Sequence, residues 1–292
     1  MMPTLTIFTP AYNRAHTLPR LYNSLLRQSC HDFVWLVVDD GSADHTAALV
    51  KEWMARDNPF SIRYIAQENQ GMHGAHNTAY RNIDTVLNTC IDSDDYMPLD
   101  AVAVIISTWN TMDQEKYAGI IGLDEDTSGN IIGTEFKKPV TTLEDFYLEG
   151  GSGDKKMVYR TEVINAYPEY PLFEGERYVG LGYKYLMIDK DYELVTVNKP
   201  LVTVEYQQDG SSLNMFRQYR KHPQGFAFIR KSAMVLSRSP KRRFMEAVHY
   251  VSSSIFSGNT RFISESPKKL LTIAALPFGV LLNLYIRYKS GK

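Results

Sequence analysis

Residues 34–42 read VWLVVDDGS, and residues 86–95 read VLNTCIDSDD. In each segment a run of strand length ends directly in a group of aspartates. The run at 34–38 is continuously apolar, which is typical of a strand that is buried on both faces of a parallel sheet. The two segments therefore predict strands of one parallel sheet whose carboxyl ends carry acidic side chains.

The first 125 residues alternate between segments with strand patterns and segments with helix patterns. The expected strands cover residues 5–9, 34–38, 62–66, 86–91 and 119–123. The expected helices cover residues 18–26, 43–56, 72–82 and 98–112. This alternation indicates right-handed βαβ units and a mostly parallel, doubly wound, Rossmann-like sheet.

The alternation ends after residue 125. Residues 124–153 are rich in glycine, acids and threonine, and they predict loop with short strands. Two strands are expected at 192–197 and 201–206, separated by Lys199-Pro200, and a polar loop at 207–212. From residue 213 onwards we expect helices interrupted near four prolines, so the chain reads as residues 1–212 followed by a helical region, 213–292.

Composition excludes some classes of protein. The chain has 292 residues, 22% of them charged, and a net charge of -1, which argues against a nucleic-acid binder. Cys30 and Cys90 lack the spacing of metal ligands, and no N-terminal apolar run exceeds strand length. We therefore expect a reduced, cytoplasmic protein.

Three polar groups follow predicted strands: Thr9–Arg14, Asp39–Ser42 and Asp92–Asp95. Ligands of open α/β sheets bind at the carboxyl ends of the strands. Five acidic residues gathered there would repel one another unless a cation or hydrogen-bond donors are present. Carboxylates suit Mg²⁺ or Mn²⁺, and such an ion could bridge a departing diphosphate. Taken alone, each group also fits a turn or a helix cap.

Four blocks carry a family resemblance: TPAYNRAHTLPRLYNSLLRQ (9–28), WLVVDDGSADHT (35–46), ENQGMHGAHNTA (68–79) and CIDSDDYMPLDA (90–101). In this order and spacing they closely resemble family 2 glycosyltransferases of the GT-A fold, over about residues 3–110. Residues 153–164 and 204–223 look like the bacterial members that build surface polysaccharides. The resemblance implies a nucleotide-binding half, 1–125, and an acceptor-binding half, 126–212.

The resemblance also implies roles for individual residues. The nucleotide would be contacted by Pro10, Tyr12, Asn13, Arg14, Asp39, Asn69, Gly71, Asn77 and Asp92. Asp94, with Asp92, would hold Mn²⁺ or Mg²⁺. The alternative to nucleotide binding by Asn77 is a hydrogen bond to its own helix.

An inverting transferase needs a base that takes the proton from the acceptor hydroxyl. Many relatives carry an acid a few positions after the equivalent of Phe173–Glu176, about where this chain has Leu181. Leucine cannot accept a proton, so we expect Glu176 to be the base, with Glu174 as a weaker candidate. The alternative interpretation of Glu176 is a solvated loop acid.

Two basic or apolar features lie in the C-terminal region. Arg220 belongs to a basic group, with Arg217, Lys221 and His222, that could fold over the diphosphate or form a solvated helix face.

Residues 270–286 are uncharged and fall short of the roughly 20 residues of a spanning helix. Because basic residues flank both ends, we expect segment 268–289 to lie in a membrane interface or to form a re-entrant hairpin. Packing on the catalytic domain or on a second subunit of a homodimer is the alternative.

These patterns favour an inverting glycosyltransferase at the cytoplasmic face of the inner membrane. It would move a sugar from a nucleotide-sugar, by resemblance a UDP-sugar, to a glycan or lipid-linked acceptor in surface-polysaccharide synthesis. A non-catalytic nucleotide-sugar-binding or scaffold protein is the alternative that Leu181 raises. A nucleotidylyltransferase is a third hypothesis, but residues 10–14 lack the phosphate-binding glycines of such enzymes.

Overall fold

The computed structural model describes residues 3–205 and 215–291. Packing of the backbone divides the chain into two compact units. The first is an α/β unit that contains the chain up to residue 69, residues 74–168 and the segment from 191 to the end of the last strand. The second is a helical unit that contains residues 70–73, 169–190 and the C-terminal helices. The helical unit therefore takes in two segments that the sequence placed in the catalytic domain.

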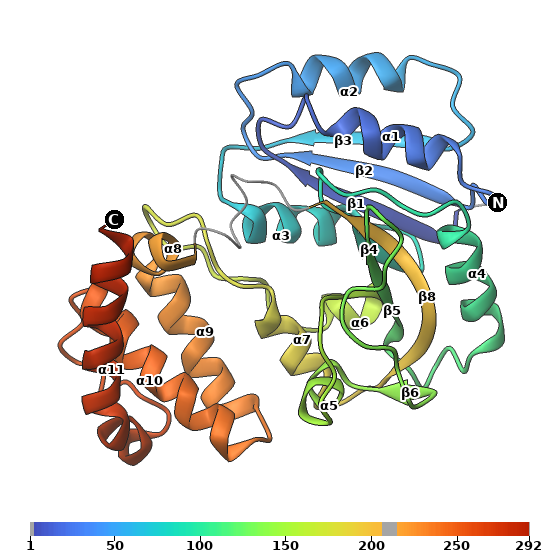
Figure 1. Cartoon of the computed structure of the whole chain (residues 1–292). Coiled ribbons are helices and arrows are strands. Elements are labelled where there is room, and N and C mark those ends of the chain that lie inside the picture. Colours follow the sequence, from blue (N-terminus) through green and yellow to red (C-terminus); the bar gives the residue numbers. More distant parts are fainter. Residues whose placement is uncertain (1–2, 206–214, 292) are drawn as a thin grey trace. The chain divides into compact units, whose positions relative to one another are not determined.

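The α/β unit holds one eight-stranded sheet (Figure 1). Its strands are β1 (Leu5–Ala11), β2 (Phe33–Asp39), β3 (Ser61–Ala66), β4 (Leu87–Cys90), β5 (Gly119–Asp126), β6 (Val140–Thr141), β7 (Lys155–Arg160) and β8 (Leu194–Val204). They lie in the order β3-β2-β1-β4-β7-β5-β8-β6. The first four are parallel, whereas β7 is antiparallel to both β4 and β5. The predicted α/β sheet, mostly parallel in its N-terminal half, is confirmed.

Helices cover both faces of this sheet. They are α1 (Leu18–Leu26), α2 (Thr46–Met54), α3 (Met72–Asn82), α4 (Ala101–Thr111), α5 (Leu143–Leu148) and α6 (Thr161–Asn165). Figure 1 shows α1 and α2 on one face of the parallel strands and α3 on the other. Because side chains alternate along a strand, Leu5 and Ile7 face the core beneath α1, and Phe8 contacts His76 and Tyr80 of α3.

The core beneath α1 and α2 is centred on stacked aromatic rings. Tyr22 lies 4.4 Å from Trp53 and 6.0 Å from Trp35, measured between ring centroids. Trp35 is fully buried, and its indole N–H donates to Thr9 Oγ1 at 3.0 Å. Buried tryptophans need such an acceptor, and this bond joins the side chains of β2 and β1 within the sheet.

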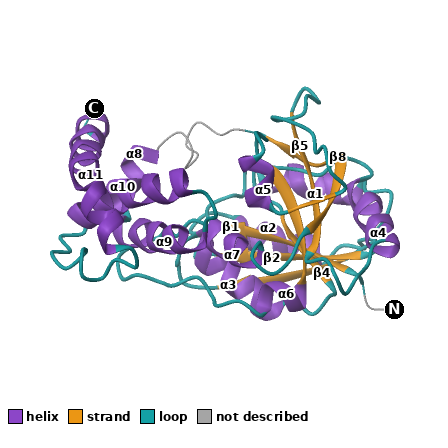
Figure 2. Ribbon diagram, turned by 90° about the horizontal axis from the view of Figure 1, so that it is seen from below, coloured by secondary structure: helices purple, strands orange, loops and turns teal. Residues whose placement is uncertain are grey.

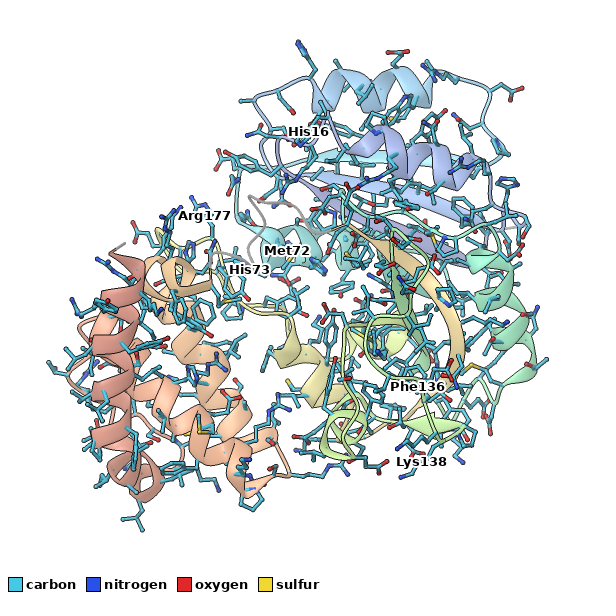
Figure 3. The ribbon with its side chains drawn as sticks, in the orientation of Figure 1. His16, Met72, His73, Phe136, Lys138 and Arg177 are labelled. Carbon is cyan, nitrogen blue, oxygen red and sulfur yellow. The ribbon has the colours of Figure 1, made fainter. Side chains whose placement is uncertain are left out.

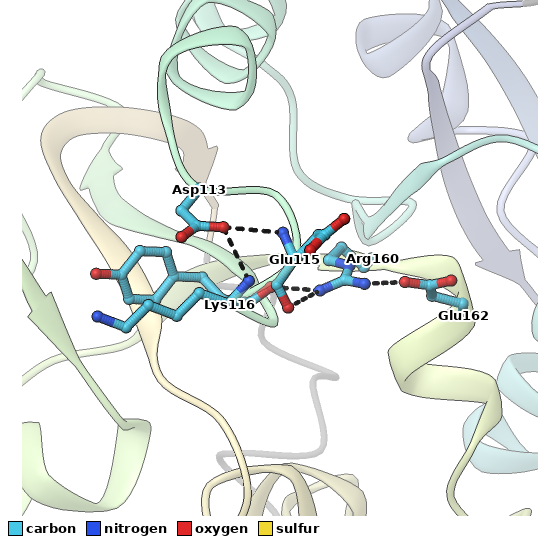
Figure 4. A network of polar contacts seen from close by, with 6 residues as sticks. Asp113, Glu115, Lys116, Arg160 and Glu162 are labelled. Atoms are coloured by element: carbon cyan, nitrogen blue, oxygen red, sulfur yellow. Dashed lines mark hydrogen bonds and ion pairs between the residues drawn. The ribbon is translucent and has the colours of Figure 1, made fainter.

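Arg160, at the end of β7, fixes the connection between α4 and β5 (Figure 4). Its guanidinium donates to the carbonyls of Glu115 and Tyr117, at 2.8 and 3.2 Å, and pairs with Glu162. Asp113 accepts the backbone N–H groups of Glu115 and Lys116, which closes the turn. The segment that leads into β5 is thereby held from both sides.

The helical unit contains α7 (Gly182–Ile188), α8 (Met215–Lys221), α9 (Pro223–Leu236), α10 (Pro240–Phe256) and α11 (Lys269–Ser290). Figure 2 shows the helices α8 to α11 as one group. Its core joins α9, α10 and α11 through residues such as Met234, Val251 and Ala275. Helices begin at Pro223 and Pro240, where proline is tolerated in the first turn.

Two expectations from the sequence need correction, and a third cannot be compared with the structure. The strands expected at 192–197 and 201–206 form one strand, β8, because a change of register against β5 accommodates Lys199-Pro200. The predicted loop at 207–212 lies outside the described residues. The segment 270–286 forms no re-entrant hairpin: α11 continues through Pro277 as one helix.

We expect Thr9→Val to lower the free energy of unfolding by about 1–3 kcal/mol, because it leaves the buried Trp35 N–H without an acceptor. Urea denaturation measures the change. In a Trp35→Phe background, Thr9→Val should lower the free energy of unfolding much less, because the indole N–H donor is gone. An equal cost in both backgrounds would show that the bond between these two residues contributes nothing.

Candidate active site

The loops that follow β1 and β2 are locked together by hydrogen bonds. Asn13 has a left-handed backbone, with φ of 55°, and its N–H donates to Ser42 Oγ at 2.9 Å. Ala43 N–H donates back to Asn13 Oδ1 at 2.8 Å, and Asp40 N–H donates to the carbonyl of Ala11 at 2.8 Å. The structure thus brings together two of the three predicted polar groups.

Asp39 and Asp40 are buried and oriented by specific donors. Asp39 Oδ1 accepts the N–H of Ser42 at 2.8 Å, and its Oδ2 accepts the hydroxyl of Tyr64 at 2.6 Å. Burial and the charge of Asp39 raise the pKa of Tyr64, so this hydroxyl remains a donor at neutral pH. Asp40 Oδ1 accepts from Gln67 Nε2 at 2.7 Å. A carboxylate has about four acceptor sites, so Asp39 can accept a further N–H from a ligand.

The third polar group forms a tight turn after β4. Asp95 N–H donates to the carbonyl of Asp92 at 3.1 Å, and Asp95 Oδ1 accepts the N–H of Glu205 at 3.1 Å. Arg20 of α1 donates to the carbonyl of Asp94 and pairs with Glu205. The turn is therefore held from α1 on one side and from the end of β8 on the other, while Asp92 and Asp94 stay half-buried.

Charge accumulates at this turn. Burial, and then the charge of Asp92, raise the pKa of Asp94, against the opposing charges of Arg14 and Arg20. Burial and the charge of Asp92 raise the pKa of Asp95 to about 8. Carboxylates with raised pKa values favour a proton or a bound cation, so a divalent ion would relieve the repulsion among them.

Lys156 of β7 is a residue of this site that the sequence analysis missed. Its Nζ donates to the carbonyl of Cys90 at 3.1 Å, at the base of the Asp92–Asp95 turn. Burial lowers the pKa of Lys156, but the carboxylates of Asp124 and Asp92 outweigh burial and raise it. The adjacent lysines Lys155 and Lys156 within block 153–164 were the signal that could have revealed it.

Asp124 of β5 faces the same buried charges. It is 4% exposed, and its Oδ1 has no hydrogen-bond partner among residues 3–205 and 215–291. Burial raises the pKa of Asp124 to about 6, although the charge of Lys156 opposes the shift. Asp124 is therefore buried within the electrostatic influence of Lys156, whose charge opposes that of the carboxylate.

The chemistry of the donor set fits a metal shared with a ligand. No three His, Cys, Asp or Glu side chains converge as a metal site within the described part of the chain. Mg²⁺ and related ions are commonly held by one or two carboxylates together with substrate phosphates. Asp92 and Asp94 offer those carboxylates, and a diphosphate would supply the remaining oxygens.

Other predicted nucleotide contacts lie at the same strand ends. Tyr12 is 50% exposed after β1, and Pro10 precedes it within the strand. Arg14 N–H donates to Thr46 Oγ1 at 3.0 Å, at the start of α2. Asn69 lies against Gly41, where an added Cβ would come within 3.0 Å of its backbone nitrogen. Asn77 is buried in α3.

Gly71 belongs to the helical unit, where its backbone touches Arg177. It has φ of +82°, and an added Cβ would lie 2.1 Å from the carbonyl oxygen of Arg177. Val179 N–H donates to His73 Nδ1 at 3.2 Å. Figure 3 labels His73 and Arg177 in this unit. This close approach requires glycine, whether or not a nucleotide also binds there.

Glu176 is buried, so its interpretation as a solvated loop acid is wrong. Its two carboxylate oxygens accept the N–H groups of Gln224 and Gly225, at 2.9 and 2.8 Å, in the first turn of α9. A carboxylate at a helix N-terminus satisfies otherwise unbonded donors and interacts favourably with the helix dipole. This contact explains the burial of Glu176 without catalysis, and its role as a base stays a prediction.

The basic group around Arg220 is more divided than the sequence suggested. Arg220 Nη1 donates to Ser290 Oγ of α11 at 3.2 Å. His222 accepts the N–H of Arg177 at 3.0 Å, and burial, with the nearby charges of Lys221 and Arg177, lowers the pKa of His222 to about 4. His222 is therefore neutral at physiological pH and does not belong to the cationic group.

An α/β sheet that gathers aspartates at the ends of its parallel strands defines a protein of the GT-A class. Staphylococcus aureus TarS, solved with UDP-GlcNAc, shares this fold with a TM-score of 0.64 and 15% identity, over 98% of this chain and 88% of that one. A mannosyltransferase of Pyrobaculum calidifontis, solved with GDP-Man and Mn²⁺, gives a TM-score of 0.58 at 16% identity, over 98% of this chain and 88% of that one.

The chain belongs to glycosyl transferase family 2, whose profile matches residues 6–162. It is 26% identical over 221 residues to WfgD of Escherichia coli, a UDP-Glc:α-D-GlcNAc-diphosphoundecaprenol β-1,3-glucosyltransferase, covering 74% of this chain and 83% of WfgD. It is 30% identical over 143 residues to an E. coli chondroitin synthase, covering 49% of this chain. The chain spans about a fifth, 21%, of that synthase.

We expect Lys156→Met to lower the free energy of unfolding by about 3 kcal/mol, because it leaves buried carboxylates without their cation. Adding Asp124→Asn should restore at least half of the loss, since it removes one of the unbalanced charges. Urea denaturation at pH 8 measures both, with the exposed Lys137→Met as the control. A double variant no more stable than Lys156→Met would contradict the pairing.

Proposed function

We propose that this protein is an inverting glycosyltransferase that moves a sugar from a UDP-sugar to a lipid-linked saccharide in surface-polysaccharide synthesis. The observation that carries the proposal is the half-buried Asp92–Asp94 pair beside the interlocked loops at 9–14 and 39–42. Membership of family 2 and the similarity to WfgD over most of both chains support the reaction class and the UDP donor.

In this proposal Asp94 and Asp92 hold Mn²⁺ or Mg²⁺ with the diphosphate of the donor. The metal would supply positive charge to the leaving diphosphate. Asp39 would accept hydrogen bonds from the nucleobase of the donor. The other proposed nucleotide contacts are Pro10, Tyr12, Asn13, Asn69, Gly71 and Asn77. Arg14 and Arg220 would add positive charge towards the diphosphate.

The proposed base is Glu176. An ionised carboxylate has about four acceptor sites, so the two bonds to α9 leave room for a hydroxyl of the acceptor. A non-catalytic nucleotide-sugar-binding protein is the second candidate. It is favoured by Leu181 and by the capping contacts that already account for Glu176.

The proposed acceptor sits on a lipid, which would place the enzyme at the cytoplasmic face of the inner membrane. α11 is long and apolar enough to cross a membrane, which by itself is weak evidence because soluble core helices pass the same test. We propose peripheral contact through this helix rather than a span. Pairing of two chains through the same helix is the competing proposal.

We predict that UDP with Mn²⁺ stabilises the protein by about 2.7 kcal/mol at 100 times its dissociation constant. Asp94→Asn should abolish the metal-dependent part, because it removes the proposed ligand. Thermal denaturation with UDP, GDP, CMP and dTDP, each with and without Mn²⁺, provides the measurement. The exposed Asp57→Asn is the matched control. Absence of stabilisation by every nucleotide in the wild type would refute the proposed donor site.

Glu176→Gln separates a base from a helix cap. If Glu176 is the base, we predict that kcat falls by about 10²–10⁴ while stabilisation by UDP and Mn²⁺ persists. The amide retains one acceptor oxygen for α9, so the folded state should survive. A variant that loses thermal stability but retains kcat in its folded fraction would assign Glu176 to capping alone.

A further inference from the structure

The outward face of α11 is built from large apolar side chains. Leu270 is 84% exposed, Leu281 64% and Tyr288 60%. They recur at helical spacing with other exposed side chains: Ile273, Phe278, Leu284 and Tyr285. We call these seven residues the α11 outer face. A continuous apolar surface of this kind marks a binding surface for protein or membrane.

The inward face of the same helix combines small and polar residues with apolar ones. Its buried residues are Thr272, Ala275, Gly279, Asn283 and Ile286, and Leu271, Leu276 and Leu282 are partly buried against the core. Asn283 Nδ2 donates to the carbonyl of Ser252 in α10 at 3.1 Å. An added Cβ on Gly279 would lie 2.4 Å from Val251 Cβ, so the two helices approach closely.

A helix that covers a water-soluble core keeps most of its large apolar side chains inward, whereas the seven residues of the α11 outer face are exposed. Small residues and interhelical hydrogen bonds on the inner face, with large apolar residues outside, are typical of helices that pack together in lipid. The side chains of α11 thus indicate lipid rather than water as the surroundings of its outer face.

The charges of this region favour an anionic surface. Residues 213–292 contain 15 Lys and Arg against two acids, Glu246 and Glu265, whereas residues 1–212 contain 17 against 31. Glu246 is buried and pairs with Arg230 and Arg242. A cationic segment next to an apolar surface is attracted to anionic lipid headgroups.

Cations lie at both ends of the outer face. Lys268 and Lys269 precede it, and Arg287 and Lys289 follow Leu284 and Tyr285. At the first end, Arg243, Lys268 and Lys269 share an open hollow of about 620 Å³ with Leu270 and Leu271. Cations beside an apolar floor suit a phosphate headgroup with its acyl chain.

A helix that spanned the bilayer would carry one of these cationic ends to the far side, against the positive-inside rule. A second copy on the same face would bring the lysines and arginines of two helices together at both ends, which is unfavourable. A helix that lies in the plane of the interface, about 5–10 Å deep, leaves both ends at the headgroups.

We propose that the α11 outer face inserts in the plane of an anionic phospholipid bilayer, with Lys268, Lys269, Arg287 and Lys289 at the headgroups. The α11 outer face would be the surface through which the proposed glycosyltransferase contacts the membrane. The choice of a bilayer as the partner rests on that proposed function. The insertion itself needs no catalysis, so the two can fail separately.

Co-sedimentation of the full chain with vesicles tests the insertion. We expect binding to phosphatidylcholine vesicles with 30% phosphatidylglycerol to be at least ten-fold tighter than to phosphatidylcholine alone. The triple variant Phe278→Ser, Leu281→Ser, Leu284→Ser should lose at least ten-fold of this affinity. The pair Lys268→Gln, Lys269→Gln should lose mainly the preference for anionic vesicles and its salt dependence.

Matched controls separate this test from folding and from catalysis. Met54→Ser, Val86→Ser and Leu99→Ser change equally exposed apolar residues of the α/β unit, and together they should leave vesicle binding unchanged. Asp94→Asn should bind vesicles like the wild type. Each α11 variant must retain the unfolding transition of the wild type. Should the triple variant fail to fold, Leu281→Ser alone replaces it, and we then expect at least a three-fold loss of affinity for anionic vesicles.

A fluorescence measurement reports which face enters the bilayer. The three tryptophans, Trp35, Trp53 and Trp109, are buried, so Leu281→Trp adds an exposed indole. Its emission should shift to the blue on anionic vesicles and be quenched by brominated acyl chains, whereas that of Leu99→Trp should not. The proposal would be overturned by an emission of Leu281→Trp that vesicles leave unchanged. It would also be overturned if the triple variant bound anionic vesicles as tightly as the wild type. A third contrary result is a wild type that binds no vesicles but forms a dimer that the triple variant abolishes.

Discussion

Repulsion among carboxylates at the end of β4 is the constraint on which the site depends. Asp92, Asp94 and Asp95 share one turn, and burial raises the pKa values of the last two. The fold holds this turn with Arg20, with the end of β8 and with Lys156 from behind. A site that binds a cation and a diphosphate would use the charge that these contacts keep in place.

The sequence predicted the parts of the fold that depend on local pattern. The strands β1 to β5 and the helix Met72–Asn82 were expected near their observed bounds because apolar runs and helical spacing are local signals. β8 was divided in two because proline usually interrupts a strand, whereas here a shift in register with β5 absorbs it. The antiparallel β7 was not expected at all, since its place between β4 and β5 depends on long-range pairing.

The same distinction applies to the site. The acidic groups after β2 and β4 could be placed at one sheet edge because parallel strands end together. The charge of Lys156 could not be connected to them, because β7 reaches β4 from about 65 residues further along the chain. Glu176 was expected to be the base, with a solvated loop acid as the alternative, and its burial was not expected since no local pattern shows that its carboxylate meets the first turn of α9.

The helical unit differs from the α/β unit in its helix contacts and in its charge. The contacts of α11 with α10 include small and polar side chains, such as Gly279 and Asn283, while seven large apolar side chains of α11 stay exposed. Composition divides the chain in the same way, since residues 1–212 contain 31 acids and 17 Lys and Arg, whereas residues 213–292 contain two acids and 15 Lys and Arg. A donor site on an acidic unit and a cationic, apolar surface on the other suit an enzyme whose acceptor is held in a membrane.

The release of UDP from a UDP-sugar is the most direct test of transfer. The full chain would be incubated with Mn²⁺, a panel of UDP-sugars and a saccharide linked to polyprenyl diphosphate, and the products separated by mass. We predict that one UDP-sugar yields UDP together with an acceptor that is one sugar heavier, dependent on the metal and on the acceptor. Nucleotide binding without product for any donor, or pyrophosphate released from a nucleoside triphosphate instead, would contradict the assignment of a glycosyltransferase.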